Sequence, residues 1–184
     1  MEKIGTDLEI WALLKGGDRS AYNFIYQREI SHLINYGRKL TQQIELIEDA
    51  VYDMFIYIWI NKAKLSDTDS IRRYLLVSFK NKLISNLKKK NKVSYQEDSF
   101  AFFENNEPSS EDLIISKEIS RERQLRLQES YANLSKRQKE AIFLKYHERM
   151  DYKDICQIMN INNQSARNLI ISGLKKLQIA FSEK

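Results

Sequence analysis

The sequence predicts an all-α protein made of two small helical domains joined by a flexible linker. The chain has 184 residues but only one proline and five glycines, too few for the many turns that β-sheets require. Over most of its length, apolar residues recur at helical spacings of three and four. Residues 94–110 lack that period and contain the only proline. We therefore expect domains at 1–93 and 118–184, with an acidic linker at 94–117.

The first domain should contain a series of amphipathic helices. Helical periodicity begins at Asp7 and resumes in "SAYNFIYQREISHLINYGRKL", where Ser20 is the expected N-cap. The next helix, within residues 43–63, has an apolar stripe with acidic residues beside it, and the polar segment "KLSDTDS" (64–70) ends it. The stripe is Ile47, Val51, Met54, Phe55, Ile58 and Trp59, and the acidic flank is Glu45, Glu48, Asp49 and Asp53.

Residues 71–93 combine strong positive charge with a strongly apolar face. They carry eight Lys or Arg and no Asp or Glu. As a helix, the segment places Leu75, Leu76, Phe79, Leu83 and Leu87 on a buried arc. The opposite face interleaves an aromatic ring, hydroxyls and an amide with lysines, which suits single-stranded nucleic acid, although a merely solvated lysine face fits equally well. That face is Tyr74, Ser78, Asn81, Ser85, Lys88 and Lys92, with Lys82 and Lys89 beside it.

The C-terminal third has the layout of a helix-turn-helix. Ser135 and Gln138 form a capping-box pattern that starts one helix. A short helix, with Asp151 as its N-cap, ends at Asn160. A longer helix then starts at Asn162 and runs to about residue 177. A short helix, a tight turn and a longer helix with a basic end are typical of this motif.

The last helix separates an apolar arc from a polar one. The predicted core arc is Ala166, Leu169, Ile170, Gly173, Leu174 and Leu177. The opposite side has amides, lysine and an isoleucine, with Arg167 at one edge and Ser165 and Lys176 at the other. Such groups can address base edges, a thymine methyl group and phosphates. An ordinary amphipathic terminal helix remains the alternative. The polar arc is Gln164, Asn168, Ile171, Ser172 and Lys175.

Three blocks taken together resemble the RNA polymerase sigma factors of the extracytoplasmic-function (ECF) type. "EDAVYDMFIYIW" (48–59) is similar to the family pattern E-D-x-V-Q-E-V-F-x-x-x-W. "YLLVSFKNKLISNLKKK" (74–90) is similar to W-L-x-x-I-A-R-N-x-x-I-D-x-L-R-R-R. Residues 134–177 are similar to the family's helix-turn-helix. The blocks occur in the family's order and spacing and cover nearly the whole chain except the linker.

The resemblance implies a role for each block. The first helix of the match would dock on core RNA polymerase through Asp49, Tyr52, Asp53 and Phe55. Residues 64–70 would capture an unstacked base of the minus-ten element. The melted strand would then be held by Arg72, Arg73, Tyr74, Ser78, Lys80, Asn81, Ser85 and Lys88. The minus-thirty-five element would contact Tyr152, Lys153, Gln164, Ser165, Arg167, Asn168, Ile171, Ser172, Lys175 and Lys176.

The sequence also departs from the family pattern. Ser85 stands where an Asp is usual, and Asn160 replaces a turn glycine. Leu169, Ser172 and Leu174 replace three arginines of the recognition helix. Each lost phosphate contact removes a counterion-release contribution to binding. We therefore expect the isolated C-terminal domain to bind duplex DNA weakly.

Several classes of protein find no support in the sequence. There is no apolar run long enough to cross a bilayer, and a cytoplasmic location is expected. No phosphate loop, nucleophile elbow or metal-ligand spacing appears, so we expect no enzyme, cofactor or metal. Cys156 is expected to be a small buried apolar residue, His32 and His147 are too isolated to bind a metal, and Trp11 and Trp59 are expected in the core.

The predicted function is that of a promoter-specificity subunit. It would bind core polymerase, recognise the minus-thirty-five and minus-ten elements in duplex and melted DNA, and promote melting. An anti-sigma factor is a partner that only the resemblance implies. Two alternatives remain: a stand-alone helix-turn-helix regulator, and a degenerate sigma-like decoy that binds polymerase without opening DNA.

Overall fold

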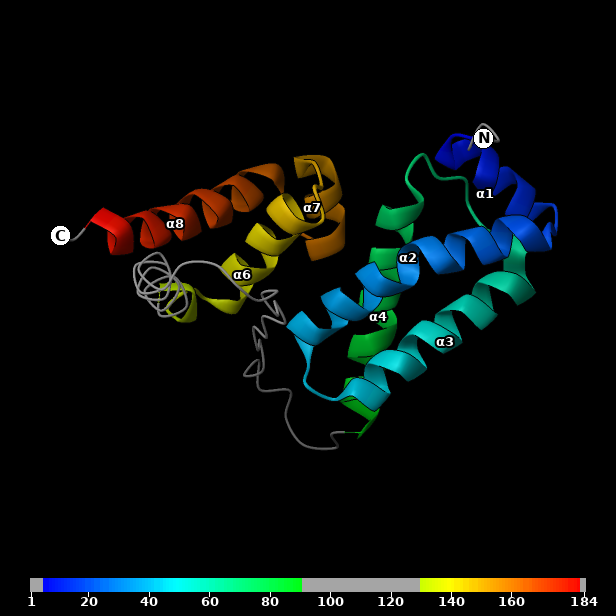
Figure 1. Cartoon of the computed structure of the whole chain (residues 1–184), viewed down its shortest axis with the longest axis horizontal. Coiled ribbons are helices and arrows are strands. Elements are labelled where there is room, and N and C mark those ends of the chain that lie inside the picture. Colours follow the sequence, from blue (N-terminus) through cyan, green and yellow to red (C-terminus); the bar gives the residue numbers. More distant parts are fainter. Residues whose placement is uncertain (1–4, 91–129, 183–184) are drawn as a thin grey trace, which may run out of the picture. The chain divides into compact units, whose positions relative to one another are not determined.

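A computed structural model describes residues 5–90 and 130–182, and every regular element in those two ranges is a helix (Figure 1). The chain divides into two compact units, residues 1–102 and 103–184. The all-α prediction is thus confirmed. The predicted linker (94–117), the first residues of the predicted second domain (118–129) and Lys92 lie outside the described residues. Within the described ranges, no helix is both long enough and apolar enough to cross a bilayer.

In residues 5–90, the described part of the first unit, there are four α-helices and a short 3₁₀ turn. They are α1 (Asp7–Lys15), α2 (Arg19–Leu40), α3 (Ile44–Asn61), η1 (Lys62–Lys64) and α4 (Ile71–Lys90). Side chains define the starts of α1 and α2. Thr6 and Glu9 form a capping box on α1. The carboxylate of Asp18 accepts hydrogen bonds from the backbone N–H groups of Ser20 and Ala21, so Ser20 is not the N-cap that the sequence predicted.

The core of the first unit lies where α2, α3 and α4 meet. Gly37 of α2 allows this close approach: a Cβ atom there would lie 2.7 Å from Ile47 Cγ2 and 2.9 Å from Phe79 Cζ. The predicted buried arc of α4 is confirmed, since Leu75, Leu76, Phe79, Leu83 and Leu87 are all buried. Trp11 is buried as predicted, whereas Trp59 is only half-buried.

The second unit contains the predicted helix-turn-helix. Its elements are α6 (Lys136–Ile142), a π-helical turn η2 (Phe143–His147), α7 (Tyr152–Met159) and α8 (Asn163–Ser182). The predicted caps all form. Ser135 and Gln138 make the capping box of α6, Asp151 Oδ1 accepts from the N–H of Asp154 at 2.7 Å, and Asn162 Oδ1 accepts from the N–H of Ser165 at 2.8 Å.

The turn between α7 and α8 uses an asparagine where backbone geometry favours glycine. Asn160 has φ 51° and ψ 56°, in the left-handed region that Asn tolerates better than most residues. Its N–H and that of Ile161 bond back to the carbonyls at the end of α7. The tight turn predicted from the sequence is therefore present.

The core face of α8 is narrower than predicted. Ala166, Ile170 and Gly173 are buried, and Gly173 lies against Ile142 of α6, whose Cδ1 would be 2.7 Å from an added Cβ. Leu174, which was predicted to be in the core, is 37% exposed because its position on the helix lies at the edge of the apolar arc. Three further residues predicted or expected to be buried are only half-buried: Leu169, Leu177 and Cys156.

Candidate nucleic-acid interface

The N-terminal end of α4 is built into an ion-pair network. Glu29 of α2 is 2% exposed, and its two carboxylate oxygens accept from Arg28 Nε at 2.6 Å and Arg72 Nε at 2.7 Å. Arg28 also pairs with Asp7 of α1 at 2.9 Å. The other Asp7 oxygen accepts from the backbone N–H of Ile71 at 2.8 Å, and so caps α4. Arg72, predicted to contact DNA, therefore joins α4 to α2.

Arg73 and Tyr74, also predicted to contact DNA, are likewise held by the protein. The Arg73 guanidinium pairs with Asp69, four residues earlier. The Tyr74 ring packs on Trp11, with centroids 4.8 Å apart. Burial raises the pKa of the Tyr74 phenol, the nearby Tyr57 phenol raises it further, and a hydrogen bond with Ser78 acts in the opposite direction. Arg72, Arg73 and Tyr74 are therefore engaged in contacts within the protein, and these contacts also hold the polar segment before α4 in place.

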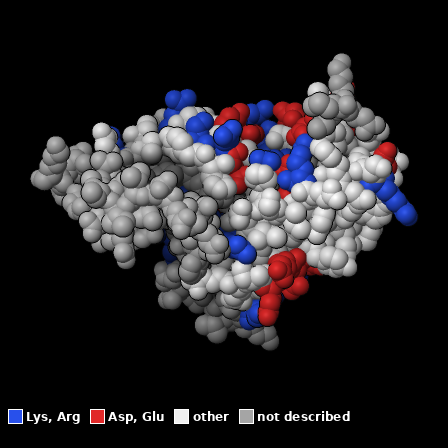
Figure 2. Space-filling view, in the orientation of Figure 1, with Lys and Arg blue, Asp and Glu red and all other residues white. Residues whose placement is uncertain are grey.

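The polar segment itself is anchored by α1. The Trp11 indole N–H donates to the Ser66 carbonyl at 3.0 Å, and Lys15 pairs with Asp67. Thr68 is buried, and its hydroxyl donates to the Ser70 carbonyl at 2.9 Å. Figure 2 shows Lys and Arg side chains lying directly beside Asp and Glu side chains, as such pairs require. Residues 64–70 thus have a defined shape.

The C-terminal half of α4 is the open part of its polar face. Asn81, Ser85 and Lys88 are exposed, as are Lys89 and Lys90 beyond them. Ser78 and Lys80 are half-buried, and Lys82 pairs with Asp53 of α3 at 2.9 Å. Of the eight residues predicted to hold the melted strand, the structure brings Asn81, Ser85 and Lys88 together on one accessible surface.

Three of the four residues predicted to contact polymerase are exposed on the outer face of α3. Asp49 and Asp53 are exposed, and Tyr52 is 67% exposed. Phe55, also predicted to contact polymerase, is instead buried, with 2% of its surface exposed. It faces α2, where the ring of Tyr26 packs edge-on against it with the ring centroids 4.9 Å apart. In the second half of the same helix, three exposed apolar residues were missed, although their position away from the buried stripe could have shown them: Ile56, Tyr57 and Ile60.

All but one of the predicted contact residues of α8 are exposed, the exception being the half-buried Ser165. Gln164, Asn168, Ile171 and Lys175 are exposed, and the Gln164 amide donates to Asn168 Oδ1 at 2.9 Å. Amide groups, an apolar contact and a lysine thus occupy one continuous surface. It has the chemistry needed to address base edges and phosphates.

Arg167 is aimed by two neighbours. Its Nε donates to Asn163 Oδ1 at 2.7 Å, and its guanidinium lies 5.0 Å from the ring centroid of Tyr152. Lys145 Nζ lies 4.8 Å from the same centroid. A cation over an aromatic face is attracted by the quadrupole of the ring. Tyr152 therefore orients Arg167 at the edge of α8, and the neighbouring Lys153 is exposed.

Three residues predicted to contact the minus-thirty-five element lie toward α6. The Gln138 amide donates to Ser172 Oγ at 2.9 Å, and Lys176 Nζ lies 3.4 Å from Gln138 Oε1 and 3.5 Å from the Asn133 carbonyl. Ser165 is half-buried on the same flank. Ser172 and Lys176 thus tie α8 to the N-terminal end of α6.

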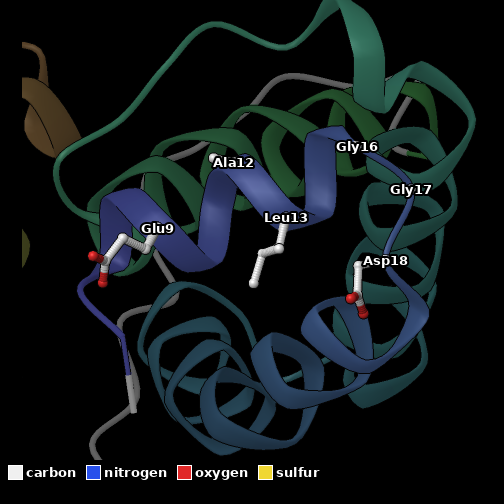
Figure 3. A pocket seen from close by; sticks show the side chains of 6 residues that line it. All are labelled: Glu9, Ala12, Leu13, Gly16, Gly17 and Asp18. Atoms are coloured by element: carbon white, nitrogen blue, oxygen red, sulfur yellow. The ribbon is translucent and has the colours of Figure 1, made fainter. Parts of the chain in front are cut away.

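A shallow hollow beside α1 is the other notable surface feature. Leu13 extends into it, and Glu9 and Asp18 line it (Figure 3). Both carboxylates already accept hydrogen bonds from backbone N–H groups at helix starts. Among the described residues, no group of three or more His, Cys, Asp or Glu could hold a metal ion. His147 stacks on Phe143 and contacts Glu148 at 3.0 Å.

Comparisons with known proteins agree with this geometry. Residues 124–177, which include the helix-turn-helix, match the family model described as Sigma-70, region 4. CnrH, solved in complex with the cytosolic domain of CnrY, matches with a TM-score of 0.62 at 16% identity over 95% of this chain and 96% of that one. The chain has the fold of an ECF-type sigma factor.

A second sigma-factor structure supports the same fold. The sigma factor RpoE, solved in complex with the anti-sigma factor NepR from Bartonella quintana, matches with a TM-score of 0.59 at 17% identity, over 89% of this chain and 98% of that one. No curated protein sequence matches the chain. The sigma-factor fold accounts for both units, one carrying α3 and α4 and the other the helix-turn-helix.

Proposed function

We propose that the chain is a promoter-specificity subunit that binds core RNA polymerase, recognises two promoter elements and promotes DNA melting. The observation that carries this proposal is the helix-turn-helix within residues 124–177, matched to sigma-70 region 4, in a chain with a sigma-factor fold. Such a function is one of binding and needs no catalytic residue or cofactor. It would be exerted in the cytoplasm, where polymerase and promoter DNA meet.

Core polymerase would bind the outer face of α3. This face combines two exposed carboxylates, Asp49 and Asp53, with the exposed ring of Tyr52. Exposed aromatic residues are enriched at protein interfaces, and carboxylates around them steer a basic partner. Phe55 would act indirectly, as the buried residue that packs α3 on α2.

Duplex DNA would be read by α8, and the melted strand would be held by α4. In α8, Arg167, Asn168 and Ile171 would face base edges, and Lys175 of α8 and Lys153 of α7 would lie at phosphates. In α4, the exposed Asn81, Ser85 and Lys88 would follow the strand. Two weak DNA contacts on one chain act as a strong one because the second contact is intramolecular.

An anti-sigma protein is the remaining proposed partner. The solved RpoE is bound to the anti-sigma factor NepR, and CnrH is bound to the cytosolic domain of CnrY. We propose that a protein of this class binds the present chain and keeps it from polymerase. Co-purification from native cells would report both polymerase and such an inhibitor.

Run-off transcription with purified core polymerase tests the proposed function. Core enzyme with the full chain should give promoter-dependent transcripts from genomic fragments, and core enzyme without it should not. A matched variant, Tyr52→Ala, should need a higher concentration to reach the same transcript level. If polymerase binds but no fragment yields a transcript, the chain is a decoy; if polymerase does not bind, it is a separate regulator.

A further inference from the structure

The boundary between α3 and α4 presents an aromatic residue without an assigned role. Tyr57 is 60% exposed, and Ile60, three residues later on the same helix, is 72% exposed. The ring of Tyr57 makes no ring–ring contact with another described residue. A large apolar ring at the surface is a ready contact for a partner, and its neighbours indicate which one.

An ion pair fixes how α3 and α4 lie against each other near Tyr57. Lys82 Nζ of α4 lies 2.9 Å from Asp53 Oδ2 of α3. The two helices run in roughly opposite directions (Figure 1). Four residues after Asp53 is Tyr57, and four residues before Lys82 is Ser78. Since residues four apart share a helix face, Tyr57 lies beside the Ser78 end of the α4 polar face.

The surroundings of Tyr74 support this placement and show that the Tyr57 ring is the more accessible of the two. The phenol of Tyr57 adds to the effect of burial in raising the pKa of Tyr74, which agrees with the position that the Asp53–Lys82 ion pair gives to Tyr57. One side of the Tyr74 ring is covered by Trp11, with centroids 4.8 Å apart. The more exposed ring at this position therefore belongs to α3, not to α4.

The exposed residues farther along α4 favour nucleic acid over a basic protein surface as the partner of Tyr57. Asn81, Ser85 and Lys88 are exposed along α4, followed by Lys89 and Lys90. The carboxylate of Asp53, four residues before Tyr57 on α3, is paired with Lys82. A strand that follows these lysines would bring a base across the boundary to α3. Base–aromatic stacking is the usual companion of such a cationic path.

Tyr57 and Tyr52 cannot both face one flat partner. They lie five residues apart on α3, which is about 140° around the helix axis. Tyr52 is on the side proposed for polymerase, and Tyr57 is on the side of α4. We propose that Tyr57 forms a stacking site for an unpaired nucleobase of single-stranded DNA, beside the lysine face of α4. This inference rests on the proposed function and adds a DNA contact from α3 to it.

The test uses the assembled complex of the full chain with core polymerase. Single-stranded DNA 12-mers selected from a random pool (a length of roughly one to three strand-binding sites) serve as the probe. The tightest binder is then labelled with 2-aminopurine at each position in turn. Stacking on Tyr57 should quench the fluorescence at one position. Tyr57→Ala should abolish that quenching and weaken strand binding about 5- to 150-fold, whereas Tyr57→Phe, which keeps the ring, should retain both.

Tyr52→Ala is the matched control on the same helix. It should weaken core polymerase binding and leave the quenching unchanged once the complex is assembled. The inference is overturned if Tyr57→Ala leaves strand binding and quenching intact, or if it weakens only polymerase binding. If the wild-type complex binds no oligonucleotide at all, the proposed function fails together with this site, which separates that result from a failure of Tyr57 alone.

Discussion

The buried carboxylate of Glu29 should be the most sensitive charged position in the first unit. Glu29→Ala would leave the guanidinium groups of Arg28 and Arg72 next to each other without their shared acceptor. Breaking a buried ion pair by removing one partner costs about 3–5 kcal/mol. Here both arginine side chains are 28–29% exposed and Arg28 keeps Asp7, so water and Asp7 recover part of the loss. We expect a destabilisation of about 2–4 kcal/mol.

Urea unfolding followed by tryptophan fluorescence measures this effect directly. The chain has two tryptophans, Trp11 and Trp59, and both lie in the first unit, so the signal reports that unit alone. Glu48→Ala, at an exposed position of α3, is the matched control and should change stability by about 0.5 kcal/mol or less. A cost below about 1 kcal/mol for Glu29→Ala, typical of exposed pairs, would refute a structural role for this network.

Three further predictions concern the loop before α7, the strand-binding face of α4 and the DNA-facing side of α8. Arg149, in the loop before α7, has a left-handed φ of 56°. Arg149→Gly should relieve that backbone strain and stabilise the second unit by about 0.5–1 kcal/mol, measured by thermal unfolding with circular dichroism; an unchanged stability would contradict the strain. Ser85→Asp places a carboxylate on the exposed part of α4 and should weaken oligonucleotide binding by the polymerase complex, whereas the neutral Ser85→Asn should not; equal effects would contradict the assignment of that face. Arg167→Lys loses the planar group that lies on Tyr152 and should relax preference at one base pair by about 1–3 kcal/mol in duplex selection, while Tyr152→Phe keeps the preference.

Local signals in the sequence were enough for the helix-turn-helix. The caps at Ser135, Asp151 and Asn162 depend on a side chain and a backbone N–H two or three residues away, so the sequence itself contains both partners. The buried arc of α4 was equally predictable, because Leu75 to Leu87 recur at helical spacing with only polar residues opposite. The start of α2 was missed by two residues because Asp18 and Ser20 are both good caps, and only the turn at Gly17, with φ 92°, decides between them.

Contacts between distant residues decided which polar side chains are already engaged within the protein. Arg72 looks like a DNA contact in the sequence, but its partner Glu29 lies 43 residues earlier. Ser172 is likewise paired with Gln138, 34 residues away. A helical wheel assigns a face but cannot show whether another helix supplies a hydrogen-bond acceptor there. For the same reason it could not place Phe55 against α2 or Tyr57 beside α4.

By itself the sequence determined the all-α class, the positions of the main helices and the helix-turn-helix, because periodicity and caps act within a few residues. It also determined the resemblance to sigma factors, since motif order and spacing lie along the chain. Only the tertiary structure separated the structural arginines from the exposed lysines of α4, because ion pairing depends on how helices pack. The same packing placed the exposed ring of Tyr57 beside α4, and the pattern of a single helix cannot show which neighbouring helix lies there.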